Sequence, residues 1–179
     1  MKFYQIDIKN IKICASQIKD INKIFDSLNF ISQKDKKIWN RVKKIKAIIV
    51  HPKIGYDNEL FRPDYIWVCE QGTVRESTMA YLASLIVHES RHVEQYIKGV
   101  RNVDFRAEPS AYQDQIEFLE KYGEKYNADY VKKLYSEKFW KNNEFLTKKG
   151  GKYTSSQPLL KFLNKYKKKE LNIKEIKEI

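Results

Sequence analysis

The stretch LASLIVHESRHVEQYIKGV, residues 82–100, holds two of the chain's three histidines at the end of a mostly apolar run. His88 and His92 stand four residues apart, and Glu89 directly follows the first of them. Apolar residues ahead of the pair predict a helix that is buried where the histidines emerge. Residues i and i+4 share one face of a helix, so both imidazoles can face a single point.

This spacing indicates a metal site rather than a charged helix with two incidental imidazoles. A catalytic Zn²⁺ takes three protein ligands and keeps a fourth position open. The pattern H-E-x-x-H on a helix supplies two of these ligands and a glutamate that can act as general base. The sequence therefore predicts His88 and His92 as zinc ligands and Glu89 as the catalytic base.

A third ligand must come from elsewhere in the chain, and a downstream carboxylate is expected to supply it. Glu108 lies 16 residues after His92, and we favour it because it enters on the first turn of the next predicted helix, whose dipole keeps a carboxylate ionised. Asp104, 12 residues after His92, is the rival. The remaining histidine, His51, ends a predicted strand before Pro52 and is interpreted as a surface or structural residue.

Around this helix the patterns predict an α+β fold, a small mixed sheet packed on the active-site helix and followed by a mainly helical C-terminal half. Alternating or β-branched runs predict strands, and periodic apolar stripes predict helices. The expected strands are 2–8, 46–52 and 65–69, with a turn at 70–73. The expected helices are 16–29, 33–44, 76–98, a stretch from about 105 whose start is limited by Pro109, and 128–139.

The length of 179 residues suits one domain with a proper core. We expect a single domain over residues 1–150. Residues 147–158 are predicted to form a flexible joint because they are rich in glycine and serine. Residues 151–179 are expected to form a lysine-rich helical C-terminal extension.

The net charge of +12 lies in the two flanks of the chain. Residues 1–50 carry 12 basic and 4 acidic groups, residues 141–179 carry 11 and 4, and residues 51–140 carry 12 and 15. Nearly all of the flanking charge is lysine, whereas a nucleic-acid groove typically shows stacking aromatics among its basic residues. We interpret the flanks as solvated lysine faces and do not expect nucleic acid as a partner.

Cysteine usage and hydropathy predict a soluble, cytoplasmic protein with no membrane partner. Cys14 and Cys69 are far apart and neither belongs to a CxxC pair, which excludes a disulfide framework and a cysteine-rich zinc site. No run approaches the ~18 apolar residues that span a bilayer. Residues 1–14 alternate polar and apolar side chains and lack the apolar core of a signal peptide.

The segments H-E-S-R-H at 88–92 and A-E-P-S-A-Y at 107–112 resemble the gluzincin-type zincin metallopeptidases, particularly small, minimal forms of that fold. The resemblance covers roughly residues 45–120. It implies a zincin-like fold, with a sheet lying over the active-site helix and a glutamate-bearing helix behind it. It also implies that an edge strand holds extended peptide, and residues 65–69 are expected to form that strand.

The resemblance carries over to individual residues. It implies His88, His92 and Glu108 as Zn²⁺ ligands, with Glu89 as general base. Tyr112, one turn beyond Glu108, stands where the larger gluzincins carry an aspartate. As a catalytic residue it would supply a phenol near the metal; its alternative is a packing role.

The leading hypothesis is a zinc-dependent metallopeptidase or related metallohydrolase that acts on a peptide or protein substrate through a metal-activated water. The alternative is a zincin-like interaction or regulatory module in which zinc is mainly structural. These two hypotheses differ in whether replacing the predicted base abolishes function. The residues leave the identity of the substrate and the oligomeric state open.

Overall fold

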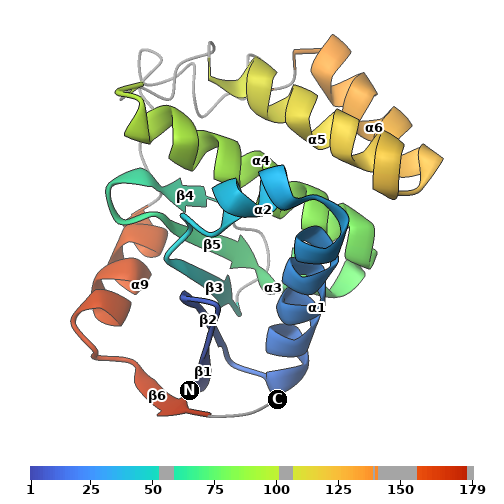
Figure 1. The fold of residues 1–179 in the computed structure, drawn as a ribbon. Coiled ribbons are helices and arrows are strands. Elements are labelled where there is room, and N and C mark those ends of the chain that lie inside the picture. The colour runs from blue at the N-terminus through green and yellow to red at the C-terminus, as the bar shows by residue number, and fades with distance from the viewer. Residues whose placement is uncertain (53–58, 101–106, 139, 141–156, 177–179) are drawn as a thin grey trace.

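The computed structural model describes residues 1–52, 59–100, 107–138, 140 and 157–176. They form an α+β fold, as expected, around one six-stranded mixed sheet of order β4-β5-β3-β2-β1-β6 (Figure 1). The strands are β1 (Lys2–Ile8), β2 (Ile11–Ala15), β3 (Ala47–His51), β4 (Glu59–Phe61), β5 (Ile66–Glu70) and β6 (Asn172–Glu175). The described helices are α1 (Ile18–Lys34), α2 (Lys36–Val42), α3 (Gln71–Glu76), α4 (Met79–Ile97), α5 (Glu108–Tyr122), α6 (Lys125–Ser136) and α9 (Gln157–Lys167), with a 3-10 turn η1 (Arg62–Asp64).

The sheet begins with a hairpin of β1 and β2, which pair antiparallel with Ile8 opposite Ile11. Between them Lys9 and Asn10 both have positive φ, 53° and 70°. Two such residues make the tight turn whose twist matches that of paired strands. The predicted strand at 2–8 is confirmed, whereas β2 was not predicted because its turn lacks the glycine that usually signals a hairpin.

The centre of the sheet consists of β3 and β5, which run parallel, with β2 parallel to β3 on the other side. Both central strands are almost entirely buried. Strands covered on both faces are typically continuous β-branched or aromatic runs, as AIIVH and IWVCE are. Both strands predicted here from the sequence are confirmed.

The prediction that residues 65–69 form the edge of the sheet is wrong. The strand β5 has β3 on one side and β4 on the other, with Glu59 opposite Val68 and Phe61 opposite Ile66. The chain reverses through η1 and Tyr65, whose φ of 55° is left-handed, and this lets the short β4 return antiparallel. Among the described strands, β4 and β6 are the outermost.

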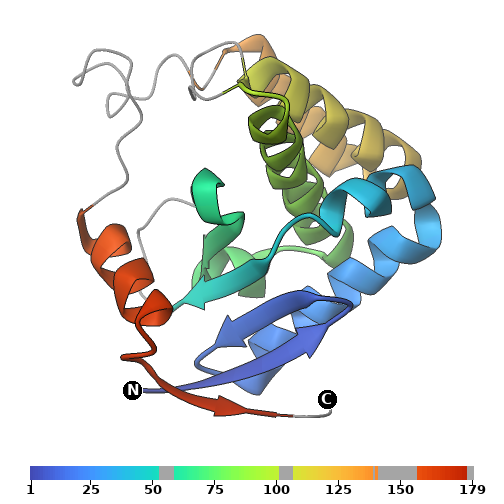
Figure 2. The ribbon, with the colours of Figure 1, turned by 60° about the vertical axis from the view of Figure 1, so that its left-hand side comes forward.

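Successive residues of a strand point to opposite faces of the sheet. Different helices cover these two faces. On one face Ile48 and Trp67 pack with Ile86 of α4 and with the buried side of α1. On the other face Ile49 packs in a cluster with Leu163 of α9. Figure 2 shows α9 and α1 on opposite sides of the strands.

The predicted turn at 70–73 is wrong, because Glu70 ends β5 and residues 71–73 form the start of helix α3. A buried tertiary network stabilises this six-residue helix despite Gly72. Asp20, 1% exposed, accepts from Gln71 Nε2 at 2.6 Å and from Arg75 Nε at 3.0 Å. The local residues predicted a turn, but the hydrogen bonds from Gln71 and Arg75 to the Asp20 carboxylate of α1 stabilise a helix instead.

The C-terminal segment is helical only as far as Lys167. The prediction of a helix throughout this segment is wrong for residues 172–175, which form β6 and pair parallel with β1. Leu171 and Ile173 alternate with polar neighbours and pack against the α9 side of the sheet. The predicted joint at 147–158 lies almost entirely outside the described residues.

The other predicted helices are present with shifted ends. The helix expected at 16–29 runs further, over Ile18–Lys34, and the one expected at 128–139 starts three residues earlier, at Lys125. None of the helices in the described ranges combines the length and the apolar character needed to cross a lipid bilayer.

Candidate metal centre

Helix α4 carries the two histidines of the candidate site. It starts after Thr78, whose hydroxyl accepts the backbone N–H of Tyr81 at 3.2 Å and so caps the helix. It is followed by Gly99, with a φ of 88° that glycine adopts without steric cost. Ile86 and Val93 are buried in the core that includes the sheet, and the histidines lie on the side that faces α5.

Helix α5 brings Glu108 to these histidines. The helix begins at Glu108, and Pro109 occupies its first turn, where the missing N–H of proline costs nothing. Glu108 therefore lies at the positive end of the helix dipole, which favours an ionised carboxylate. Helices α4 and α5 lie against each other (Figure 1), so this end of α5 meets the histidine face of α4.

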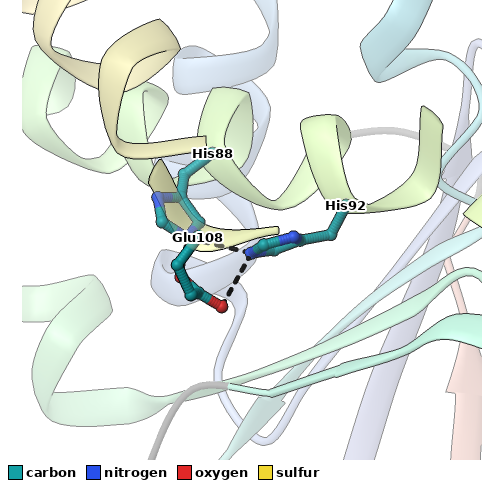
Figure 3. A group of neighbouring side chains, drawn as sticks. All are labelled: His88, His92 and Glu108. Atoms are coloured by element: carbon teal, nitrogen blue, oxygen red, sulfur yellow. Dashed lines mark hydrogen bonds and ion pairs between the residues drawn. The ribbon is translucent and has the colours of Figure 1, made fainter. Parts of the chain in front are cut away.

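Three side chains converge on one point. The Nε2 atoms of His88 and His92 are 3.2 Å apart. Glu108 Oε2 lies 3.4 Å from His88 Nε2, and Oε1 lies 3.3 Å from His92 Nε2 (Figure 3). Within the described parts of the chain, this is the one group of three or more His, Cys, Asp or Glu side chains whose ligand atoms fall close enough together, within 4.8 Å, to share a metal ion.

These separations fit a tetrahedral zinc ion. Two ligand atoms that each lie roughly 2.0–2.1 Å from a tetrahedral Zn²⁺ are separated from each other by about 3.3–3.4 Å. The 3.2 Å between the two Nε2 atoms is close to that edge length. Each Nε2 lies at a similar distance, 3.3 or 3.4 Å, from a different oxygen of the Glu108 carboxylate. Two imidazoles and one carboxylate are also a donor set that zinc accepts.

The hydrogen bonds behind His88 determine which of its ring nitrogens faces this point. Ser84 donates its hydroxyl proton to the Tyr81 carbonyl at 2.7 Å, so its oxygen accepts from Gln115 Nε2 at 3.1 Å. Gln115 Oε1 then faces His88 Nδ1 at 3.2 Å and accepts its proton. Nε2 of His88 is left with a free lone pair, as a metal ligand requires.

His92 is oriented in the same way by Gln95. The Gln95 amide nitrogen donates to the Ala107 carbonyl at 2.8 Å and to Ser110 Oγ at 2.7 Å. Its oxygen therefore faces His92 Nδ1, 2.8 Å away, and accepts the ring proton. The Nε2 of His92 also presents a lone pair to the centre.

Two lone pairs and a carboxylate thus meet in a largely buried space. His88 is 9% exposed, His92 4%, and the Glu108 side chain 19%. Left to themselves such groups repel one another, and the repulsion grows as water is excluded. A divalent cation satisfies all three groups at once, so the residues present fit a metal ion.

The local electrostatics also favour positive charge at this point. Burial opposes ionisation of Glu108, but the two adjacent imidazoles outweigh burial and hold the pKa of Glu108 well below its usual range. Burial likewise opposes protonation of His88, but Glu108 outweighs it and raises the pKa of His88 overall. Both shifts mean that a proton or a metal cation is attracted to the same place.

Glu89, the predicted base, is half-buried on α4 beside His88. Burial raises the pKa of Cys69 on β5 and of Tyr112 on α5, and the charge of Glu89 adds to both shifts. The Glu89 carboxylate therefore acts on the region between the sheet and α5, next to the metal ligands. The role of Glu89 as general base stays a prediction.

Tyr112 contacts the site through its ring. The ring lies edge-to-face against His88, with centroids 4.9 Å apart, and it packs at a tilt of 34° against Trp140, with centroids 5.0 Å apart. Burial, followed by the charge of Glu108, raises the pKa of Tyr112 above its usual range. The ring contact shows that Tyr112 packs against the His88 imidazole, and the proposed role of its hydroxyl stays a prediction.

Two residues considered from the sequence lie away from the site or outside the described residues. Asp104, the rival third ligand, lies outside the described ranges, so of the two candidates only Glu108 is placed. His51 is buried at the end of β3 and packs on Phe162 of α9, with centroids 4.5 Å apart, on the opposite face of the sheet from α4. This agrees with a structural role for His51.

The sequence analysis assigned no role to Gln95, Gln115 or Ser84. Their positions carried a weak signal: Gln95 stands three residues after His92, and Gln115 two helical turns after Glu108, so each shares a helix face with a ligand. Nothing in the sequence alone distinguishes these glutamines from the exposed ones.

No protein-family model, curated protein or solved structure matches this chain. The three side chains are therefore a candidate metal centre on their own geometry, in which two imidazoles and one carboxylate present ligand atoms within 4.8 Å of one another.

Proposed function

We propose that this protein is a zinc-dependent metallopeptidase, or a related metallohydrolase, that cleaves peptide bonds with a metal-activated water. The observation that carries the proposal is the convergence of His88 Nε2, His92 Nε2 and the Glu108 carboxylate at mutual separations of 3.2–3.4 Å. Three protein ligands are the number that a catalytic zinc site uses, and water or substrate takes the fourth position in such a site.

The roles of the residues follow from their chemistry. Bound Zn²⁺ would act as a Lewis acid that polarises a substrate carbonyl and lowers the pKa of a water to about 7. His88, His92 and Glu108 hold the ion. Glu89 takes the proton of the attacking water and passes it to the leaving amine.

Tyr112 is the proposed hydrogen-bond donor to the oxygen on which negative charge develops. A phenol is protonated over the whole physiological pH range even at its ordinary pKa of about 10, so it can donate. A donor must be protonated when the substrate arrives. Its ring contact with His88 places the residue beside the metal ligands.

The arrangement of helices and strands supports the interpretation of this chain as a zincin-like fold of the gluzincin type. A sheet packs over α4, which carries the histidines, and α5 with its glutamate lies behind. The antiparallel β4, an outer strand of the described sheet, takes the place proposed for residues 65–69 as the strand that holds extended peptide. An extended peptide or protein segment is therefore the proposed substrate, and the buried free thiols of Cys14 and Cys69 support a reducing, cytoplasmic setting.

The proposal is tested by measuring zinc and peptidase activity in the same preparations. The wild-type protein is expected to hold about one zinc per chain and to hydrolyse unstructured peptides. Glu89→Gln should keep the zinc and lose activity by at least about 10²-fold, because only the proton acceptor is removed. Glu117→Gln, which changes an exposed glutamate of α5, is the matched control and should alter neither property.

The ligand variants complete this test. His92→Ala and Glu108→Ala should both lose stoichiometric zinc. Zinc retained at wild-type affinity in Glu108→Ala would exclude Glu108 as the third ligand and point to Asp104. A metal-replete wild-type protein with no bound zinc would overturn the proposal. Zinc bound in wild type but no activity on any peptide would support the alternative, an interaction module with structural zinc.

A further inference from the structure

Gln95 contacts both halves of the metal centre. Its Oε1 lies 2.8 Å from His92 Nδ1, and its Nε2 donates to the Ala107 carbonyl at 2.8 Å and to Ser110 Oγ at 2.7 Å. Ala107 directly precedes Glu108, and Ser110 follows it by two residues. One amide group therefore joins a ligand on α4 to the backbone that carries the ligand on α5.

The start of α5 depends on contacts from outside the helix. Its N-cap residue, Ala107, has no side chain that can accept a hydrogen bond from the first turn. A helix end without a capping side chain is fixed by other partners or frays. The Gln95 amide does not cap free N–H groups, because its nitrogen donates, but it ties this turn to α4 through the Ala107 carbonyl and the Ser110 hydroxyl.

We propose that Gln95 is the positioning residue that assembles the metal centre, by fixing His92 in its Nδ1–H tautomer and holding Glu108 at the start of α5 through the same amide group. This inference rests on the proposed function only through zinc binding, and it is independent of the reaction catalysed. Gln95 touches neither the metal nor the substrate, and its effect passes through the two ligands.

Gln115 provides an internal comparison, because it orients His88 without holding a backbone carbonyl. Its Oε1 accepts from His88 Nδ1, and its Nε2 donates to Ser84 Oγ. A serine hydroxyl can rotate and become a donor, whereas a carbonyl oxygen only accepts. A carboxylate is therefore tolerated in place of the Gln115 amide. In place of the Gln95 amide, a carboxylate oxygen would face the Ala107 carbonyl oxygen, and neither atom carries a proton to form a hydrogen bond.

This difference defines the experiment. The zinc dissociation constants of wild type, Gln95→Glu, Gln95→Leu and Gln115→Glu are measured by competition with a chromophoric chelator. Gln113→Glu, at an exposed position of α5, is the matched control for added charge. Visible absorption of the Co²⁺-loaded proteins reports the number of ligands, since Co²⁺ absorbs less strongly when water replaces a protein ligand.

Gln95→Leu is expected to weaken zinc binding about 10- to 100-fold, the usual effect of losing a group behind a metal ligand. Gln95→Glu should weaken it at least about tenfold and reduce the Co²⁺ absorption, although it keeps an acceptor for His92. Gln115→Glu should bind as tightly as wild type or more tightly, because a carboxylate also accepts from His88 Nδ1. Gln113→Glu should bind as wild type does.

The outcomes separate this inference from the proposed function. Wild-type affinity and absorption in Gln95→Glu would overturn the inference, because Gln95 would then act only on His92. Equal weakening in Gln95→Glu and Gln115→Glu would also overturn it. A wild-type protein that binds zinc without hydrolysing peptides overturns the proposed reaction alone, and one that binds no zinc overturns both.

Discussion

His88 and His92 each have two ring nitrogens, and the glutamines behind them decide which nitrogen faces Glu108. These acceptors are neutral amides, whereas carboxylates are common in this position in metal sites. A neutral acceptor fixes the tautomer without adding negative charge. The candidate centre therefore has one carboxylate among these five groups, and a dication held there would be a stronger Lewis acid than one whose histidines were backed by carboxylates.

At the same scale, two buried thiols predict how stability depends on pH. Burial raises the pKa of Cys14 to about 12, and it raises the pKa of Cys69 as well. In the unfolded chain a thiol titrates near about 8.5. Above that pH the unfolded state releases protons that the folded state retains, so the free energy of unfolding should fall as pH rises, by up to about 1.4 kcal/mol per pH unit for each thiol.

Urea unfolding at pH 8.0 and at several pH values up to 9.5 measures this slope, to which the buried tyrosines with raised pKa values add near the upper end of the range. Cys14→Ala should lose its share of the slope, although the variant is less stable at every pH. A wild-type stability that is unchanged between pH 8.0 and 9.5 would contradict the assignment of both thiols as buried and protonated.

At the scale of secondary-structure elements, an ion cluster joins three helices behind the metal centre. Arg41 of α2 donates to Ser90 Oγ of α4 at 2.9 Å and pairs with Asp114 of α5. Arg91 Nε lies 3.7 Å from the same carboxylate. Ser90 and Arg91 lie between the two histidines on α4, and Asp114 directly precedes Gln115, so the cluster holds the helices that carry the ligands.

Asp114→Ala removes the shared carboxylate, so Arg41, whose side chain is 13% exposed, keeps only Ser90, whereas Arg91 keeps its ion pair with Glu94. We expect the free energy of unfolding to fall by about 2–3 kcal/mol, because a charged group that loses its partner in a partly buried site is poorly solvated. Chemical denaturation of the metal-free protein measures this change. Glu117→Ala on the same helix is exposed and should stay within about 0.5 kcal/mol of wild type; equal effects of the two substitutions would show that the cluster adds nothing.

The local patterns predicted the elements that carry the ligands and missed several that hold them together. The helix α4 was predicted because its apolar periodicity, its histidine spacing and Gly99 all lie within one segment. Pro109 placed the start of α5 for the same reason. The helix α3 was missed because Asp20, about 50 residues earlier in the chain, stabilises it against its own turn signal.

At the scale of the whole molecule, the C-terminal segment covers the sheet face opposite the metal centre. Leu163 of α9 is 2% exposed and belongs to a cluster with Phe3 and Val68 of the sheet. The strand β6 extends the same sheet by pairing with β1. The final residues of the described chain thus pack against its first strand.

Leu163→Ala is therefore expected to lower the free energy of unfolding by about 2–4 kcal/mol through lost burial and an unfilled cavity. Lys161→Ala, on the exposed side of α9, should change it by less than about 0.5 kcal/mol. Both values come from chemical denaturation. If Leu163→Ala is as stable as the wild type, α9 does not contribute to the folding of the sheet.

The sequence by itself determined the helix with its histidine pair and the helix that opens with Glu108. Each depends on side chains within about one or two turns of one another, and helix geometry fixes those distances wherever the helix lies. Only the tertiary structure decided that β4 rather than β5 is an outer strand, that the C-terminus returns to β1, and that Gln95 and Gln115 lie behind the ligands. These features depend on distances between segments that are far apart in the sequence. Chain reversal and the packing of α4 against α5 determine those distances, and no local sequence pattern encodes them.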